Sequence, residues 1–304
     1  MSEMLLEKIQ TFKKQRNAVI LAHNYQPGEI QDLADFTGDS LGLSVQAAQT
    51  DADVIVFCGV LFMAETATIL SPKKTVLLPE INAGCPMADM INAQQLRELK
   101  GQHPEALVVC YVNSTAEVKA LSDYCCTSGN ALELIQTLPK DQEVIFIPDK
   151  NLGGFINERT GRDMILWPGY CPTHTWILPE HIATIRKTHP DAQVLAHPEC
   201  NSDVRAVADE LLSTGQMLKY AQTSGGNEFV IATENGIIHS LQKQNPDKRF
   251  YPATEKAICL NMKKISLEKV AWALEDMQYQ VTVPEPACTD AKRSLDRMLE
   301  VIPE

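Results

Sequence analysis

The chain has 304 residues, of which 44% are apolar and 22% charged, a composition typical of a soluble globular enzyme with one large domain or two to three small ones. Its 27 basic and 39 acidic residues give a net charge of −12, which argues against nucleic acid or an anionic membrane as a general partner. Residues 1–16 lack the apolar core of a signal peptide, and the longest apolar stretch, 54–64, is too short to span a bilayer. We therefore expect a cytoplasmic protein.

Four segments within the first 85 residues alternate between strand and helix patterns. "NAVILAHNYQ" (17–26) is a short apolar run that ends on polar residues, and "TGDSLGLSVQAAQ" (37–49) places Ser and Gly at the start of a helical pattern. "DVIVFCG" (53–59) predicts a second strand, and "TVLLPEINAGC" (75–85) predicts a third, followed by a proline and then a cysteine. Such runs are typical of a parallel α/β sheet, whose carboxyl edge usually binds ligands.

The same order of patterns recurs twice further along the chain. The second copy consists of "ALVVCYVNST" (106–115), "CCTSGNALELIQTL" (125–138), "EVIFIPD" (143–149) and "DMILWPGYC" (163–171). The third copy consists of "AQVLAHPECN" (192–201), "LLSTGQMLKYAQT" (211–223), "EFVIATE" (228–234) and "RFYPATEKAIC" (249–259). We interpret the three copies as one repeated α/β unit.

The spacing of polar landmarks supports the repeat. His23 and Cys85 are 62 residues apart, and His197 and Cys259 are also 62 residues apart. In the middle copy, 58 residues separate Asn113 from the final cysteine, Cys171. The three final cysteines are separated by 86 and 88 residues, so the landmarks recur as a set.

We predict an α/β fold with three pseudo-symmetric αβα domains, whose short parallel sheets surround a central site. The first domain comprises residues 1–85 together with 262–304, whose helices dock on it; the second comprises 86–171 and the third 172–261. "SLEKVAWALEDMQ" (266–278) predicts one of these C-terminal helices, and a last helix follows a proline-rich turn.

The nine cysteines are odd in number and follow no secretion signal, which argues against a disulfide framework. Cys85, Cys171 and Cys259 end the three copies, so three domains around one axis would bring them together. Three thiolates on a [4Fe–4S] cluster would leave one iron open to act as a Lewis acid. Buried thiols, a zinc site with three sulfurs, and a catalytic Cys171–His174 pair are the alternatives.

Polar residues at the predicted strand ends and helix starts are candidates for the site. His23 and His197 recur at one strand-end position, and Glu199 is the best general acid/base candidate because it is the carboxylate beside a repeated histidine. The helix starts and strand ends offer further anion-binding and hydrogen-bonding groups: Ser40, Ser128, Ser213 and Thr214, and Tyr25, Tyr111 and Asn113.

The motifs "LAHNYQ", "DSL", "FMAETA", "GCPMADM", "CYVNSTAEVKA", "CCTSGNA", "GYCPTH", "HPEC", "STGQM" and "CLNM" resemble those of the quinolinate synthases of NAD biosynthesis. The resemblance runs from about residue 17 to beyond residue 262, in the family's order. It implies three αβα domains around a [4Fe–4S] cluster held by Cys85, Cys171 and Cys259. The matching substrate-binding and catalytic positions are His23, Tyr25, Ser40, Tyr111, Asn113, Ser128, His174, His197, Glu199, Ser213 and Thr214.

The resemblance also implies the reaction, in which iminoaspartate condenses with dihydroxyacetone phosphate to give quinolinate, phosphate and water. Within it we assign proton transfer to Glu199 and Tyr25, and phosphate binding to His197 with Ser213 and Thr214; His23 is a further catalytic candidate. An aspartate oxidase or dehydrogenase is the expected source of iminoaspartate.

The third ligand position departs from a pattern found in some members of the family. They carry Cys-x-x-Cys-x-x-Cys there, whereas this chain reads "CLNMKKI" with Cys259 alone, so redox control by that motif is not expected. Cys200 and the adjacent Cys125 and Cys126 are assigned to packing. A [4Fe–4S] hydro-lyase acting on another small acid and a cluster-based redox sensor are the alternative functions.

Overall fold

The computed structural model describes residues 2–301 and places their twelve strands in three separate four-stranded sheets. The first sheet contains β1 (Ala18–His23), β2 (Phe36–Gly38), β3 (Val54–Cys58) and β4 (Thr75–Leu77). The second contains β5 (Leu107–Tyr111), β6 (Tyr124–Cys126), β7 (Val144–Ile147) and β8 (Ile165–Leu166). The third contains β9 (Gln193–Ala196), β10 (Glu210–Leu211), β11 (Glu228–Ala232) and β12 (Arg249–Pro252).

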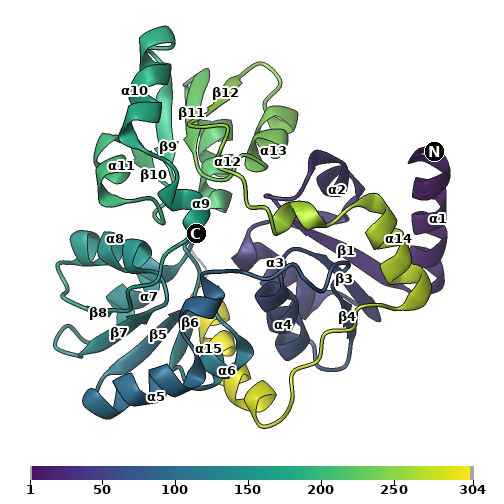
Figure 1. Ribbon diagram of the computed structural model, residues 1–304, viewed down its shortest axis with the longest axis horizontal. Coiled ribbons are helices and arrows are strands. Elements are labelled where there is room, and N and C mark those ends of the chain that lie inside the picture. Colours follow the sequence, from purple (N-terminus) through teal and green to yellow (C-terminus); the bar gives the residue numbers. More distant parts are fainter. Residues whose placement is uncertain (1, 302–304) are drawn as a thin grey trace.

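The three sheets share one topology. Their strand orders are β2-β1-β3-β4, β6-β5-β7-β8 and β10-β9-β11-β12, and all strands within each sheet run parallel. The predicted α/β class with three short parallel sheets is therefore confirmed. Figure 1 shows the sheets in three lobes around a common centre.

Each sheet carries helices in the same order along the chain. The first is accompanied by α1 (Ser2–Gln15), α2 (Gly28–Leu33), α3 (Ser40–Gln49), α4 (Leu61–Leu70) and the short η1 (Ala88–Met90). The second is accompanied by α5 (Ala93–Gln102), α6 (Ala116–Ala120), α7 (Ala131–Thr137), α8 (Lys150–Thr160) and α9 (Pro172–Thr175). The third is accompanied by α10 (Pro179–Thr188), α11 (Ser202–Val207), α12 (Thr214–Thr223), α13 (Ile237–Gln244) and η2 (Met262–Lys264), after which α14 (Leu267–Asp276) and α15 (Ala287–Glu300) end the described chain.

Each sheet has one strand that the sequence patterns did not predict. These are the edge strands β2, β6 and β10, which are only two or three residues long and carry no alternating pattern of burial. Each edge strand directly precedes a loop and then α3, α7 or α12, so pairing with the sheet fixes where these helices begin. The other three strands of each sheet were predicted by the patterns and are present.

Side-chain caps define several helix starts that face the centre. Asp39 accepts a hydrogen bond from the backbone N–H of Gly42 at the start of α3, and Asp149 accepts from two N–H groups of α8. Ser213 and Gln216 form a reciprocal capping box at the start of α12. These caps satisfy the N–H groups that a helix start leaves without partners inside the helix.

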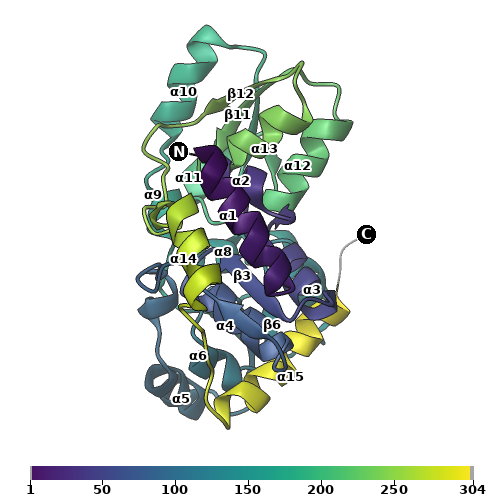
Figure 2. The same cartoon turned by 90° about the vertical axis from the view of Figure 1, so that its right-hand side faces the viewer.

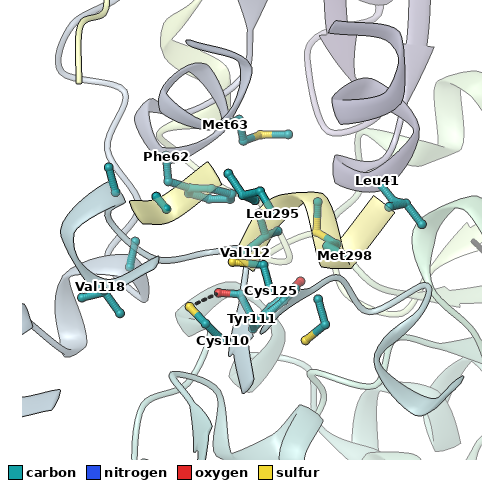
Figure 3. Packing of buried hydrophobic residues seen from close by; sticks show 14 of the residues in the cluster. Leu41, Phe62, Met63, Cys110, Tyr111, Val112, Val118, Cys125, Leu295 and Met298 are labelled. Atoms are coloured by element: carbon teal, nitrogen blue, oxygen red, sulfur yellow. Dashed lines mark hydrogen bonds between the residues drawn. The ribbon is translucent and has the colours of Figure 1, made fainter. Parts of the chain in front are cut away.

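The last helix, α15, joins the first and second sheets into one apolar core. It packs against α6, β6 and α4. Figure 3 shows Leu295 and Met298 of α15 among Phe62, Met63 and Val112. The third sheet has its own buried clusters on its two faces, so its core is separate from the shared one.

The predicted domain limits at residues 85, 171 and 261 stay a prediction, and residue 1 and residues 302–304 lie outside the described part of the chain. Helix α14 packs beside α1 on the first sheet, as Figure 2 shows, whereas α15 reaches the second sheet as well. We use first, second and third unit for the three sheets with their helices. No helix among residues 2–301 is long and apolar enough to cross a membrane.

Candidate active site

A pocket lined by residues of all three units lies at the carboxyl ends of their strands. Thirteen of the fourteen residues proposed from the sequence line this pocket: His23, Tyr25, Ser40, Cys85, Tyr111, Asn113, Ser128, Cys171, His174, His197, Glu199, Thr214 and Cys259. Ser213 does not line it, because its hydroxyl caps α12 by accepting from the backbone N–H of Gln216 (3.3 Å). The fold thus gathers residues that are up to 236 positions apart.

The two repeated histidines share a local geometry that fixes their tautomer. Nδ1 of His23 accepts the backbone N–H of Tyr25 (3.1 Å), and Nδ1 of His197 accepts that of Glu199 (3.2 Å). A neutral imidazole with Nδ1 as acceptor carries its proton on Nε2. The Nε2 of His197 donates to Ser128 Oγ (3.1 Å), so the ring links the third unit to the second.

Both histidines are held neutral. Burial, which disfavours the imidazolium, lowers the pKa of each from 6.5 to about 3. For His23 the nearby Lys263 adds to the effect of burial, and for both rings Glu199 opposes it. The two rings therefore act as neutral N–H donors at any pH near 7.

A chain of hydrogen bonds runs from Glu199 to Tyr25. Oε2 of Glu199 lies 2.7 Å from Nδ1 of His174, and Nε2 of His174 lies 2.8 Å from Thr233 Oγ1. The Tyr25 hydroxyl is 2.6 Å from Thr233 Oγ1 and 3.0 Å from Thr214 Oγ1. The His174 ring and the hydroxyls of Thr233 and Tyr25 can each donate and accept a hydrogen bond, and the Glu199 carboxylate accepts one. The chain can therefore pass a proton between the third unit and the first.

Glu199 is a buried carboxylate held in its charged form. Burial alone would raise its pKa, but the adjacent His174, which hydrogen-bonds to it, and a hydrogen bond from Tyr111 together lower the pKa below its usual range. Burial, followed by the charge of Glu199, raises the pKa of the Tyr111 phenol. Glu199 is therefore placed as a proton acceptor with a neutral phenol beside it.

Several small polar groups also line the pocket. Ser40 is the first residue of α3, Ser128 lies in the loop before α7, and Thr214 is the first residue of α12. Oδ1 of Asn113, just after β5, is buried and has no hydrogen-bond partner among the described residues. Hydroxyls, an amide and helix starts are suited to binding carboxylate or phosphate oxygens.

Cys85, Cys171 and Cys259 line the pocket, one from each unit, and each precedes a short helical turn. Backbone N–H groups point at every one of these sulfurs: from Met87 and Ala88 at Cys85, from His174 at Cys171, and from Asn261 and Met262 at Cys259. Donors of this kind stabilise metal-bound thiolates. Since burial raises the pKa of all three thiols, to about 12 for Cys85, a cation is what would make them thiolates. The donor set therefore fits an iron–sulfur cluster.

Two carboxylates that the sequence reasoning missed hold these cysteine loops. Glu234 Oε1 accepts the backbone N–H of Cys259 (2.9 Å), and the backbone N–H of Cys171 is one of the groups that lower the pKa of Asp149. They follow β11 and β7, the second strands of their repeats. The predicted strands "EVIFIPD" and "EFVIATE" both end on an acid, and this recurrence is the signal that could have identified the pair.

Asp39, Thr127, Thr233 and Lys263 were also missed. Asp39 and Thr127 line the pocket directly before Ser40 and Ser128, the neighbours that the sequence reasoning chose instead, and Thr233 directly follows β11. Lys263 lies outside these positions; it pairs with Glu234 (2.9 Å) and donates to the backbone carbonyl of Tyr25. Its role follows from the approach of the third unit to the first, which no local pattern encodes.

The remaining cysteines lie outside the pocket. Cys200, Cys125 and Cys126 are fully buried, and Cys200 donates its S–H to the carbonyl of Ala232 (3.3 Å). One mixed set of donor atoms also stands out: ligand atoms of Cys171, His174 and Glu199 lie within 4.8 Å of one another. That set overlaps the hydrogen-bond chain, since the His174 contact to Glu199 belongs to both.

Three parallel α/β units around a cysteine-bearing pocket define an internally repeated α/β enzyme fold. Residues 7–300 match the model of the family described as Quinolinate synthetase A protein, and the chain belongs to this family. It is 56% identical over 300 residues to the quinolinate synthase of Dehalococcoides mccartyi, covering 99% of each chain. It is 54% identical over 297 residues to quinolinate synthase 1 of Methanosarcina acetivorans (98% of this chain, 97% of the relative) and 50% identical over 294 residues to the quinolinate synthase of Geotalea uraniireducens (97% and 96%).

Proposed function

We propose that this protein is a quinolinate synthase of NAD biosynthesis, which condenses iminoaspartate with dihydroxyacetone phosphate and releases quinolinate, phosphate and water. The observation that carries the proposal is one pocket that holds a cysteine from each unit beside a Glu199–His174–Thr233–Tyr25 hydrogen-bond chain. Close relatives over nearly the full length support the same activity. An aspartate oxidase or dehydrogenase in the cytoplasm would supply the iminoaspartate.

Cys85, Cys171 and Cys259 would hold a [4Fe–4S] cluster. With three protein ligands, such a cluster would leave one iron open, which would supply Lewis-acid chemistry.

The chain's own residues supply the binding and proton transfer. Ser40, Ser128 and Thr214, with the neutral Nε2–H groups of His23 and His197, bind the carboxylate and phosphate oxygens of the two substrates. Glu199 accepts protons during imine formation and dehydration. The Tyr25 hydroxyl donates and accepts protons at the other end of the hydrogen-bond chain. Asn113 contributes its unpartnered carbonyl oxygen as an acceptor for a substrate N–H or O–H.

The residues around the cysteines also bear on the alternative of a redox sensor. An electron carrier wraps its cluster in protein, whereas this pocket places a ring of hydroxyl, imidazole and amide groups beside the cysteines. Those groups suit a small polyanionic substrate and favour an enzyme.

The test is an anaerobic assay of purified, iron-loaded protein with iminoaspartate generated in situ and dihydroxyacetone phosphate. Quinolinate, detected by its absorbance after chromatography, is the expected product. Cluster-replete protein that forms no quinolinate would rule the function out.

The ligand assignment is tested separately. Cys171→Ala should lose the brown cluster absorbance and most of its iron, while Cys288→Ala, at a partly exposed cysteine on α15, should keep both. A full cluster in Cys171→Ala would show that this cysteine is no ligand.

A further inference from the structure

Loops from all three units meet at Asp39, at the end of the pocket formed by the helix starts. Its carboxylate accepts the backbone N–H of Gly42 in its own helix α3 (2.8 Å) and lies against the start of α12 in the third unit, where the backbone N–H of Gly215 is one of the groups that lower the pKa of Asp39. Gly129 of the second unit is also close: a Cβ built there would lie 3.8 Å from Asp39 Oδ2. One side chain therefore serves two helix starts from two units.

A glycine at position 215 is what allows this approach. A Cβ at that position would lie 2.7 Å from Asp39 Oδ2, closer than side chains tolerate. The contact therefore depends on both helices: α3 is capped by the Asp39 carboxylate, and α12 has a glycine where a side chain would clash with that carboxylate. Burial raises the pKa of the Asp39 carboxyl, and the N–H donors of Gly42 and Gly215 oppose that rise.

Asp39 also separates two hollows. It lines the central pocket, and it lines an outer groove between α3 and α12 that includes Leu41, Val45, Leu212 and Tyr220. Among the described residues it is the one shared by both linings. The wall between the central pocket and the outer groove therefore runs through this carboxylate.

The third unit is joined to the others mainly by polar contacts. The first two units share an apolar core under α15, as Figure 3 shows, while the third has separate cores. Gln31 of the first unit donates to the carbonyl of Gly236 (2.8 Å), and Arg205 pairs with Glu158 of the second unit (2.6 Å). Units joined by polar interfaces move relative to one another by default.

We infer that Asp39 is a positioning residue whose carboxylate ties the start of α12 to the start of α3 and so closes the wall between the central pocket and the outer groove. Loss of the tie shifts the third unit towards arrangements in which the groove opens into the pocket. The helix starts that carry Ser40 and Thr214 then separate, and a bound dianion escapes faster. This inference rests on the proposed function for its ligand, and on geometry alone for the tie.

Two substitutions attack the tie from opposite sides. Asp39→Asn keeps an oxygen to cap α3 but turns an N–H₂ group towards the Gly215 N–H, and Gly215→Ala keeps the charge but inserts a methyl group. The matched controls are Gly225→Ala, where an added Cβ meets nothing within 4 Å, and Asn92→Ala, which removes the cap of α5 far from the junction.

The first measurement needs no ligand. Hydrogen–deuterium exchange of the peptide that contains Gly215 should be about tenfold faster in Asp39→Asn and Gly215→Ala, because the carboxylate packed against this helix start shields its backbone N–H groups from solvent. The double variant should exchange no faster than either single variant, since both remove one contact. The controls should match wild type. Unchanged exchange in Asp39→Asn would overturn the tie.

The second measurement uses radiolabelled quinolinate bound to the iron-loaded protein and chased with unlabelled quinolinate. Both variants should release it about tenfold faster and keep wild-type iron content. Faster exchange with unchanged release would overturn the closing of the wall, and tighter binding in Asp39→Asn alone would mean that the carboxylate merely repels anions. Wild-type protein that binds no quinolinate would instead refute the proposed function, and exchange would then decide the tie.

Discussion

The ends of β1 and β9 are built alike but carry different chemistry. Ala-His stands at the carboxyl end of each, with His23 the last residue of β1 and His197 the first residue after β9. In each the histidine Nδ1 accepts the backbone N–H two residues on, from Tyr25 in the first unit and from Glu199 in the third. Burial holds both imidazoles neutral, with a pKa of about 3. The repeat has preserved the backbone and the ring, while the residue two positions after the ring is a phenol in one unit and a carboxylate in the other.

This difference shows how a symmetric scaffold produces an asymmetric site. Identical helix starts and neutral imidazoles around an axis can bind anionic groups but cannot move protons in one direction. Glu199 and Tyr25 face each other through His174 and Thr233, so the acid/base function exists only because the two strand ends differ. Substitutions at the two strand ends should therefore differ in their effects.

Glu199→Gln should have the largest effect. The amide keeps the shape of the side chain but removes the charge that His174 and Tyr111 stabilise, so the turnover rate should fall by about 10³-fold. Steady-state assays of iron-loaded protein measure this, with the iron content as a check on the cluster. A turnover rate within threefold of wild type would remove Glu199 from proton transfer.

Tyr25→Phe should come next, with a loss of about 10²-fold in turnover, since it removes a hydroxyl and leaves Thr214 and Thr233 without that partner. Tyr251→Phe is the matched control, because its hydroxyl makes one long contact (3.4 Å) to Glu228 at the edge of the third unit. If the two phenylalanine variants lost activity equally, the hydrogen-bond chain would not be the cause.

The sequence predicted much of this site because its residues occupy repeated positions. Strand ends, helix starts and final cysteines recur in register, so three copies of a weak local pattern reinforced one another. The pairing of His174 with Glu199 was not predicted, because it joins an element after Cys171 to the end of β9, and only the assembled units bring them to 2.7 Å. Helix α15 was assigned to the first unit, yet it packs on α6 and β6 as well, and an amphipathic pattern says nothing about which apolar surface it covers.

A third prediction concerns pH. A histidine with a pKa of about 3 in the folded state and 6.5 in the unfolded state binds its proton mainly when unfolded, so stability is full above pH 6.5 and is lost as the pH falls towards 3. Each ring contributes about 1.4 kcal/mol per pH unit in that window. When the pH falls from 6.5 to 5, the free energy of unfolding of His197→Gln and of His23→Gln should therefore each decrease by about 2 kcal/mol less than that of wild type.

Denaturant unfolding at the two pH values, followed by tryptophan fluorescence on protein freed of iron by a chelator, measures this difference. The two variants should behave alike, because the two strand ends bury their rings alike. A variant with the acid sensitivity of wild type would show that its histidine is already protonated in the folded protein.

The smallest effect on stability and activity is expected at the position three residues after the repeated histidine, His23 or His197. Gln26 and Cys200 occupy this position and are both fully buried, but Gln26 reaches Met262 of the pocket wall (3.3 Å), whereas Cys200 packs in the core of the third sheet. Cys200→Ala should therefore cost about 1 kcal/mol of stability through a small cavity and leave iron content and turnover unchanged. Chemical unfolding and iron analysis of the same preparation test both halves. Loss of iron would make Cys200 a ligand and would extend the difference between the two strand ends from proton transfer to the metal site.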